Sequence, residues 1–338
     1  MGTIALDGQI KKGSGFTVST LNLDFEGKVH QLMFNGYNYQ NISLNGSFNQ
    51  KLFTGTLSID DPNLKIDTLN GSVNLSKDDP IFDFNARLKY ANLKALHLAA
   101  DNFSLSGSFN LNFTGNNIDN FLGEASLRDA SLKLDSTRLS FDSLTLTSDY
   151  DSGFKRLVVR SNEIDGTLRG QFNILQLPDA FKLFLNKYYP SKIDAPAYHL
   201  SGQDFTFDIK TRVIDDYVKL FDKRLKGFNF STFTGNIKSE QNELNVFAKI
   251  QSFEYDGKQF NDIKLESHGN SDSLLTNVTA GEIIISDSLR FPSSTLTVAT
   301  HNDRSIVHLI TSSSSGTLGD ADLNTLVETT PDGGNIHF

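Results

Sequence analysis

Along most of the chain, apolar and polar side chains alternate with a period of two residues. Leu21–Phe25 (LNLDF), Phe109–Phe113 (FNLNF) and Phe205–Ile209 (FTFDI) each place three apolar residues in one phase and polar residues in the other. Successive side chains of a strand point to opposite faces, so this pattern predicts sheets with one apolar and one polar face. The continuous apolar runs of buried parallel strands are scarce. We therefore expect an antiparallel meander of hairpins.

Turn-forming sequences separate these runs. They include Asp60–Asn63 (DDPN), Lys77–Pro80 (KDDP) and Tyr255–Gly257 (YDG). Their spacing predicts roughly twenty short strands.

A short glycine-containing motif repeats within the strands. The sequence LNGSFN at Leu44–Asn49 recurs as LNGSVN at Leu69–Asn74 and LSGSFN at Leu105–Asn110. In each copy the glycine lies in the apolar phase. Glycine weakens a strand, and its usual justification is a sharp bend or the close approach of another chain. The repeats predict a sheet bent along its length, and ordinary bulges in a β-sandwich remain the alternative.

Helices are expected at two places. Asp179–Tyr188 follows Pro178 and carries an apolar stripe at helical spacing, and a second helix is predicted from Asp215 to Lys226, closed by Gly227. A single helical turn is an option at Asn117–Leu122. Two such helices are too short to cover one face of so many strands.

The division of the chain follows from these elements. We predict a first β-segment over residues 1–176, a helix-bearing connection over 177–227, and a second β-segment over 228–338. Both ends of the chain read as parts of strands, as expected of an interior segment of a longer protein. No run approaches the ~20 apolar residues that a membrane-spanning helix needs.

Composition argues against several classes of function. Lys and Arg number 31 against 40 Asp and Glu, a formal net charge of −9, whereas nucleic-acid binders concentrate positive charge. There is no Cys, which excludes disulfides and thiolate sites. The seven His residues lack metal-ligand spacing. We therefore expect no metal, no cofactor and no nucleic-acid partner.

Two segments invite a catalytic interpretation. His301–Asp303 (HND) is better explained as a hairpin turn, and Ser312–Gly316 (SSSSG) as a loop with no base nearby in sequence. We expect no catalytic residues and no enzyme activity. This directs attention to the apolar face itself.

The sequence resembles the TamB and AsmA-like family of bridge-type lipid transfer proteins of Gram-negative envelopes. The resemblance lies in the long meander, in the Leu-Asn-Gly-Ser repeats, and in the step from Phe53–Leu57 (FTGTL) to the DDPN turn. The resemblance implies an all-β, elongated and curved antiparallel meander with a taco-like hydrophobic groove and two or three short helices. It also implies a periplasmic location, an inner-membrane anchor, which we expect to lie outside this segment, and an outer-membrane partner barrel of the Omp85 type. The family's groove is thought to carry phospholipid and to support outer-membrane protein assembly.

The predicted ligand is the acyl chain of a phospholipid, and the predicted lining combines the apolar phases of the strands. It comprises Ile42, Leu44, Phe48, Phe53, Leu57, Phe82, Phe84, Leu105, Phe109, Leu111, Leu132, Leu134, Leu144, Leu146, Phe205, Phe207, Phe230, Leu244 and Val246. Asn45, Asp83, Asn110, Asp208 and Asn245 are expected on the opposite face.

Two alternatives use the same pattern differently. A closed β-sandwich or solenoid adhesion module would cover the apolar face with a second sheet and take no lipid. A polysaccharide-active enzyme would need clustered acidic residues beside exposed aromatic platforms, and the chain has no Trp.

Overall fold

The computed structural model describes residues 4–15, 20, 22–34, 36–134, 137–198, 200, 202–219, 222–312 and 320–337. It divides into two compact units, the first formed by Met1–Asp149 with Val159–Asn162 and the second by Tyr150–Val158 with Glu163–Phe338. The all-β, antiparallel fold expected from the alternation is confirmed in both units. The three segments predicted from the sequence stay a prediction, and each unit is described below by itself.

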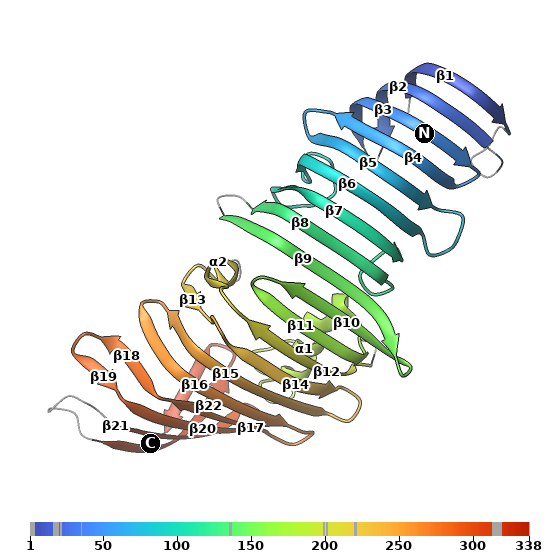
Figure 1. Cartoon of the computed structure of the whole chain (residues 1–338). Coiled ribbons are helices and arrows are strands. Elements are labelled where there is room, and N and C mark those ends of the chain that lie inside the picture. Colours follow the sequence, from blue (N-terminus) through green and yellow to red (C-terminus); the bar gives the residue numbers. More distant parts are fainter. Residues whose placement is uncertain are drawn as a thin grey trace. The chain divides into compact units, whose positions relative to one another are not determined.

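The first unit is a meander in which strands pair in chain order (Figure 1). Its strands are β1 (Ile4–Ser14), β2 (Asn22–Phe34), β3 (Tyr37–Asn49), β4 (Leu52–Asp60), β5 (Leu64–Asn74), β6 (Ile81–Asn92), β7 (Phe103–Thr114), β8 (Leu122–Leu134) and β9 (Thr137–Asp151). Every pairing between them is antiparallel. Adjacent strands of a sheet lie about 4.8 Å apart, so the eight steps from β1 to β9 span on the order of 40 Å.

Cross-strand register aligns the apolar residues of successive strands. One row runs across β3 to β9 through directly paired residues: Leu44, Leu57, Leu69, Ala86, Phe109, Leu127 and Leu144. Because each residue in the row faces its partner across a strand pair, the whole row lies on one face. We call this face of the first unit its apolar face.

Three polar residues with positive φ interrupt the alternation: Asn41 (φ 51°), Asp129 (φ 48°) and Asp262 (φ 52°). Around Asn41, the interruption lets Tyr39 and Ile42, three residues apart, both be buried. Asn and Asp adopt this left-handed conformation more readily than other non-glycine residues. The strands thereby change phase while their apolar residues stay on one face.

A row of glycines crosses the apolar face where Gly46, Gly55 and Gly71 pair directly. A Cβ at Gly55 would lie 2.4 Å from the carbonyl oxygen of Asn45, and one at Gly46 would lie 2.5 Å from that of Thr54. Of the two usual reasons for glycine inside a strand, a bend or a close approach, the structure shows the close approach at these positions. Side chains at these positions would collide with the backbone of the neighbouring strand.

The second unit is also a meander, with short strands added beside its longest hairpin. Its strands are β10 (Phe154–Ser161, shared with the first unit), β11 (Ile164–Gln171), β12 (Asp204–Thr211), β13 (Leu225–Gly227), β14 (Thr232–Lys238), β15 (Glu243–Tyr255), β16 (Lys258–Gly269), β17 (Leu274–Ala280), β18 (Glu282–Ser286), β19 (Leu289–Phe291), β20 (Ser293–His301), β21 (Arg304–Ser312), β22 (Ala321–Thr330) and β23 (Gly333–His337). The long strands β15 and β16 extend beyond β14 and β17. There β13 pairs with β15, and β18 pairs with β16.

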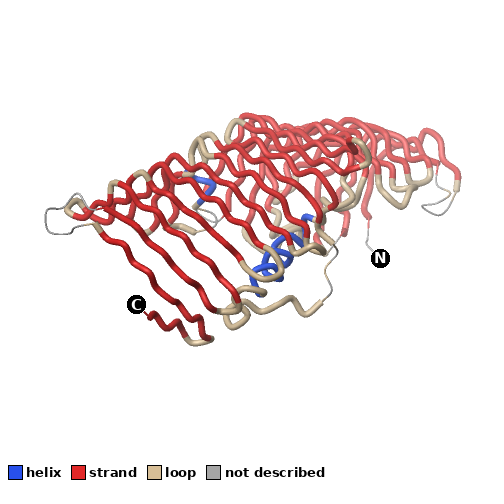
Figure 2. The backbone as a smooth tube through the Cα atoms, turned by 90° about the horizontal axis from the view of Figure 1, so that it is seen from below, coloured by secondary structure: helices blue, strands red, loops and turns tan. Residues whose placement is uncertain are grey.

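Helix α1 (Leu177–Asn186) confirms the first predicted helix and follows a 3₁₀ turn, η1 (Ile174–Gln176). Figure 2 shows α1 beside the strands of the second unit. The second predicted helix is wrong in length, because α2 spans only Asp215–Val218 and Leu225–Gly227 form β13. Positions 220 and 221 of that prediction lie outside the described residues.

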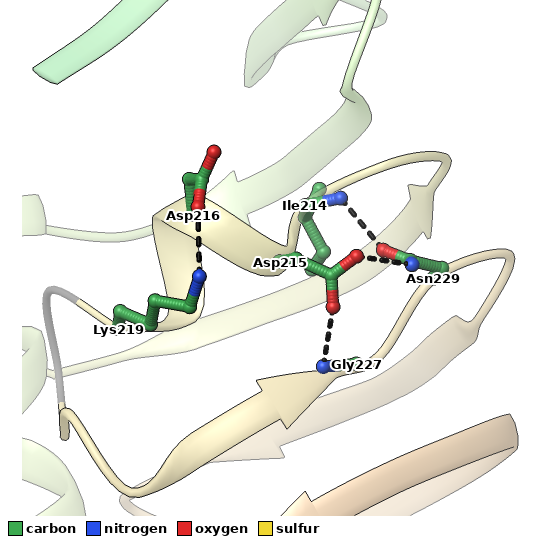
Figure 3. Close-up of polar contacts among 6 residues, drawn as sticks. All are labelled: Ile214, Asp215, Asp216, Lys219, Gly227 and Asn229. Atoms are coloured by element: carbon green, nitrogen blue, oxygen red, sulfur yellow. Dashed lines mark hydrogen bonds and ion pairs between the residues drawn. The ribbon is translucent and has the colours of Figure 1, made fainter.

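Contacts of Asp215 tie the start of α2 to the segment that follows it. Its carboxylate accepts hydrogen bonds from the backbone N–H of Gly227 (2.7 Å) and the side-chain amide of Asn229 (2.7 Å), as Figure 3 shows. The side-chain oxygen of Asn229 in turn accepts from the N–H of Ile214 (2.7 Å). These bonds hold the start of α2 against the β13 segment. At the third predicted helical site, Asn117–Leu122, the chain forms a turn instead. There the backbone N–H groups of Asn116 and Asn117 donate to the side-chain oxygen of Asn120.

Candidate functional site

The apolar face of the first unit is the candidate site. It collects every lining residue predicted for this unit, through direct pairs such as Phe48 with Phe53 and Phe84 with Leu111. The remaining members follow the same register: Ile42, Leu44, Leu57, Phe82, Leu105, Phe109, Leu132, Leu134, Leu144 and Leu146. The rows are completed by four residues outside the predicted lining, which share the phase of the repeated glycines: Leu69, Val73, Ala86 and Leu127.

Exposure distinguishes this face from a closed core. Of the lining residues in the first unit, Ile42 and Phe53 are buried, and the others are half-buried. On the opposite face Asn45, Asp83 and Asn110 are exposed, as expected from the alternation. A second sheet packed on the apolar face would bury its side chains further. Within the described part of this unit, all strand pairings belong to one sheet.

Loops cover part of each margin of this face. After β6 the chain turns back, and Leu96, only 1% exposed, packs in a cluster with Tyr39, Ile42 and Ala91. At the other end of β6, the ring of Phe121 lies 4.9 Å from that of Phe113. The rows between these margins keep their half-buried exposure.

A buried carboxylate supports the first margin, although its sequence context, the DDPN motif, indicates only a turn. Asp61 is fully buried and accepts hydrogen bonds from the Tyr37 hydroxyl (2.6 Å) and from the backbone N–H groups of Gln40 (2.9 Å) and Asn63 (2.8 Å). Burial, followed by the bond to Asp61, raises the pKa of Tyr37. The arrangement satisfies the carboxylate with protein donors and ties β3 to the β4–β5 turn.

The second unit has a corresponding face. Phe205 and Leu244 each pair with Ile237 of β14, while Phe207 and Val246 each pair with Gly235. Asp208 is exposed on the other face, and Asn245 is half-buried there, donating to Asn236 (3.0 Å).

Phe230 does not join this face. It lies in the turn before β14 with φ 52° and is 64% exposed. The turn, in which Phe228 also has a positive φ, takes Phe230 out of the alternating pattern on which the prediction depended.

Helix α1 covers one margin of this second face. Phe184 is 4% exposed, and a Cβ at Gly269 would lie 2.8 Å from its ring, so the glycine makes room for the helix. The Tyr188 hydroxyl donates to the carbonyl oxygen of Asn270 (2.5 Å), and burial raises the pKa of Tyr188 to about 12. The segment after the helix continues along the margin, where the Tyr189 hydroxyl lies 2.9 Å from that of Thr300.

The segments examined for chemistry have structural roles where they are described. His301 ends β20 and Arg304 begins β21, which confirms the hairpin turn, and Asp303 within it accepts from the Ser191 hydroxyl (2.8 Å). Of the serine run, 313–316 lie outside the described residues. Among the residues that are described, no group of His, Asp and Glu has the arrangement of a metal site.

No helix in the described ranges has the length and apolar character to span a bilayer. The chain matches no protein-family model, no curated protein and no solved structure. The resemblance to bridge-type lipid transfer proteins therefore stays an expectation from the sequence.

Proposed function

We propose that the apolar face of the first unit binds phospholipid acyl chains, as an interior segment of a periplasmic bridge that carries lipid between the inner and outer membranes and supports outer-membrane assembly. The observation that supports this most is the continuity of the apolar rows. Leucine, isoleucine and phenylalanine side chains follow one another across directly paired strands and remain half-buried between the covered margins. An inner-membrane anchor and a partner barrel of the Omp85 type would belong to parts outside this chain.

The energetics of acyl transfer suit such a surface. Burying a methylene is worth about 0.8 kcal/mol. Moving an acyl chain of about sixteen carbons from a membrane into water therefore costs a free energy on the order of 12 kcal/mol. An apolar surface shared by successive strands lowers this cost along its whole length. Because its side chains are chemically alike, it offers no single deep position that would retain the lipid.

Leu111→Arg tests the proposal. Leu111 is half-buried in β7 and lies between Phe84 and Ala125 on the neighbouring strands, in the middle of the apolar face. An arginine there places a charge where the acyl chain would lie, and desolvating that charge is costly. On a partly open face the long side chain can reach water, so the fold should survive. We expect phospholipid bound after incubation with vesicles to fall about tenfold, which corresponds to 1.4 kcal/mol.

Asn112→Arg is the matched control, since Asn112 is the next residue of the same strand and is exposed on the polar face. Lipid extracted from the purified variants is measured by mass spectrometry, and folding is checked by circular dichroism. Unfolding of Leu111→Arg alone would favour the closed adhesion module. Equal lipid content in both variants, or no lipid in the unaltered protein, would refute acyl binding on this face.

A further inference from the structure

The polar face of the first unit carries a connected series of hollows. The first, about 380 Å³ in volume, crosses β5 to β8, and its lining includes Asn70, Asn85, Arg87, Ser108, Asn110 and Arg128. Thr68 is shared with a second hollow, Lys28 joins the second to a third, and Lys89 joins the third to a fourth. The hollows therefore form one continuous surface, which we call the polar trough.

The polar trough is cationic although the chain carries a net charge of −9. Its basic residues are Lys28, Lys65, Arg87, Lys89, Arg128, Lys133 and Arg138. Its acidic residues are Glu26, Asp60 and Asp67.

Ion pairs use only part of this positive charge. Lys65 pairs with Asp60 (3.4 Å), while Lys89 (2.5 Å) and Arg87 (3.9 Å) share the carboxylate of Asp67. The structure gives Lys28, Arg128 and Lys133 no ion-pair partner among the described residues. Positive charge therefore remains available to an anionic ligand.

An amide ladder runs across the first hollow. Asn70 pairs with Asn85, and Asn85 pairs with Asn110, so three identical side chains stand on consecutive strands. None of these three amides has a hydrogen-bond partner within the described chain, and all are exposed. Their repeat equals the interstrand distance of about 4.8 Å, which is close to the length of one sugar ring in an extended glycan. Each amide can both donate and accept, as recognition of sugar hydroxyls requires.

The fourth hollow adds an aromatic surface. It is lined by Tyr90, 36% exposed, together with Lys133, Arg138 and Ser131. A tyrosine ring offers an apolar face on which the C–H groups of a sugar can pack, with a hydroxyl at its edge. The cations beside it are placed to pair with an acidic substituent of that sugar.

We propose that the polar trough binds a linear acidic oligosaccharide, running across the strands with one sugar ring at each strand. The amide ladder contacts the ring hydroxyls, and Arg128 and Lys133 pair with the carboxylates. Arg87 joins them, because Asp67 lies 3.9 Å from it and is held more closely by Lys89 (2.5 Å). A membrane surface is disfavoured because Tyr90 is the only large apolar side chain prominently exposed among the described residues that line the trough. The side chains proposed to contact the sugar, such as Asn85, Asn110 and Arg128, alternate with the residues proposed to bind acyl chains and so lie on the opposite face of the sheet.

Calorimetric titration with oligogalacturonate tests the proposal, with an uncharged galactan oligosaccharide as the control ligand. We expect oligogalacturonate to bind and the galactan to bind at least tenfold more weakly. Binding should weaken with added salt, because exposed charges are screened beyond about 8 Å at physiological ionic strength. The double variant Arg87→Gln/Arg128→Gln should lose at least tenfold in affinity.

Two further variants separate a built site from general charge attraction. Asn85→Ala keeps the charge and should still weaken binding several-fold, whereas Lys249→Gln, at an exposed position of β15 in the second unit, should change nothing. An Asn85→Ala variant with full affinity, or equal losses in the double variant and Lys249→Gln, would overturn the proposal. So would tighter binding of oligouridylate or of anionic vesicles to the same arginines, or no binding of oligogalacturonate at low salt.

Discussion

Replacing Gly55 by alanine tests whether the glycine row is needed for the close approach of β3, β4 and β5. The added methyl group would lie 2.4 Å from the carbonyl oxygen of Asn45 and 2.6 Å from the Cα of Gly46. Both are backbone atoms of the paired strand, so relief requires the strands themselves to move apart. Introducing a methyl group into well-packed structure costs about 1–3 kcal/mol.

A compensating term acts in the other direction. Alanine is favoured over glycine inside a strand by roughly 0.5–1 kcal/mol, because glycine loses more backbone entropy on folding. We therefore expect Gly55→Ala to lower the free energy of unfolding by about 1–2 kcal/mol. Gly166→Ala is the matched control, since Gly166 also lies within a strand, and its nearest contact to an added Cβ is Ile209 at 3.9 Å. That variant should be neutral or slightly stabilised.

Urea unfolding followed by circular dichroism measures both changes, with separate transitions fitted if the two units unfold independently. An unchanged or increased stability of Gly55→Ala would refute the steric reasoning, because it would mean that β3 and β4 can separate at no cost. A loss in Gly166→Ala equal to that in Gly55→Ala would also refute it.

Two other predictions concern tyrosines. Tyr37→Phe removes the 2.6 Å hydrogen bond to the buried Asp61 and should lower the free energy of unfolding by about 1–3 kcal/mol. The control Tyr150→Phe changes a tyrosine that is 63% exposed and should have little effect. Equal losses in the two variants would contradict a structural role of Asp61. Tyr188 has a pKa of about 12 in the folded protein against 10.0 for the free side chain, so between pH 10 and 12 the unfolded chain has lost a proton that the folded chain keeps. The contribution of Tyr188 to the free energy of unfolding should accordingly be fully present below pH 10 and fall by about 2 kcal/mol toward pH 12. Chemical unfolding across this pH range should show a smaller fall in Tyr188→Phe.

Much of the fold could be predicted because alternation is a local property. The phase of Phe109, Leu111 and Phe113 depends only on their spacing, and the structure places all three on one face. The repeated glycines could be assigned to the same face for the same reason. The close approach of two backbones at Gly46 and Gly55 did not follow, because a glycine in the apolar phase of a strand is equally compatible with a bend.

What could not be predicted depends on contacts distant in sequence. Nothing local to Tyr188 indicates that its hydroxyl meets Asn270, 82 residues later. Asp61 looked like one more turn residue, because its burial depends on Tyr37 of another strand. The predicted helix beginning at Asp215 has suitable charges and an apolar stripe, yet α2 ends at Val218, because Leu225–Gly227 pair with a strand that follows about thirty residues later.

The chain-order pairing of the first unit has a consequence for how it gains and loses structure. Because the strand pairings from β1 to β9 join strands that are adjacent in sequence, most of this sheet can form by adding one hairpin at a time to an existing edge, and contacts such as Leu96 with Tyr39 close a longer loop afterwards. Stability is then passed from strand to strand, much as in an array of structural repeats. Such an array frays first at its ends. A lesion in a central strand such as β5 would instead divide it into two shorter arrays, each with a newly exposed edge.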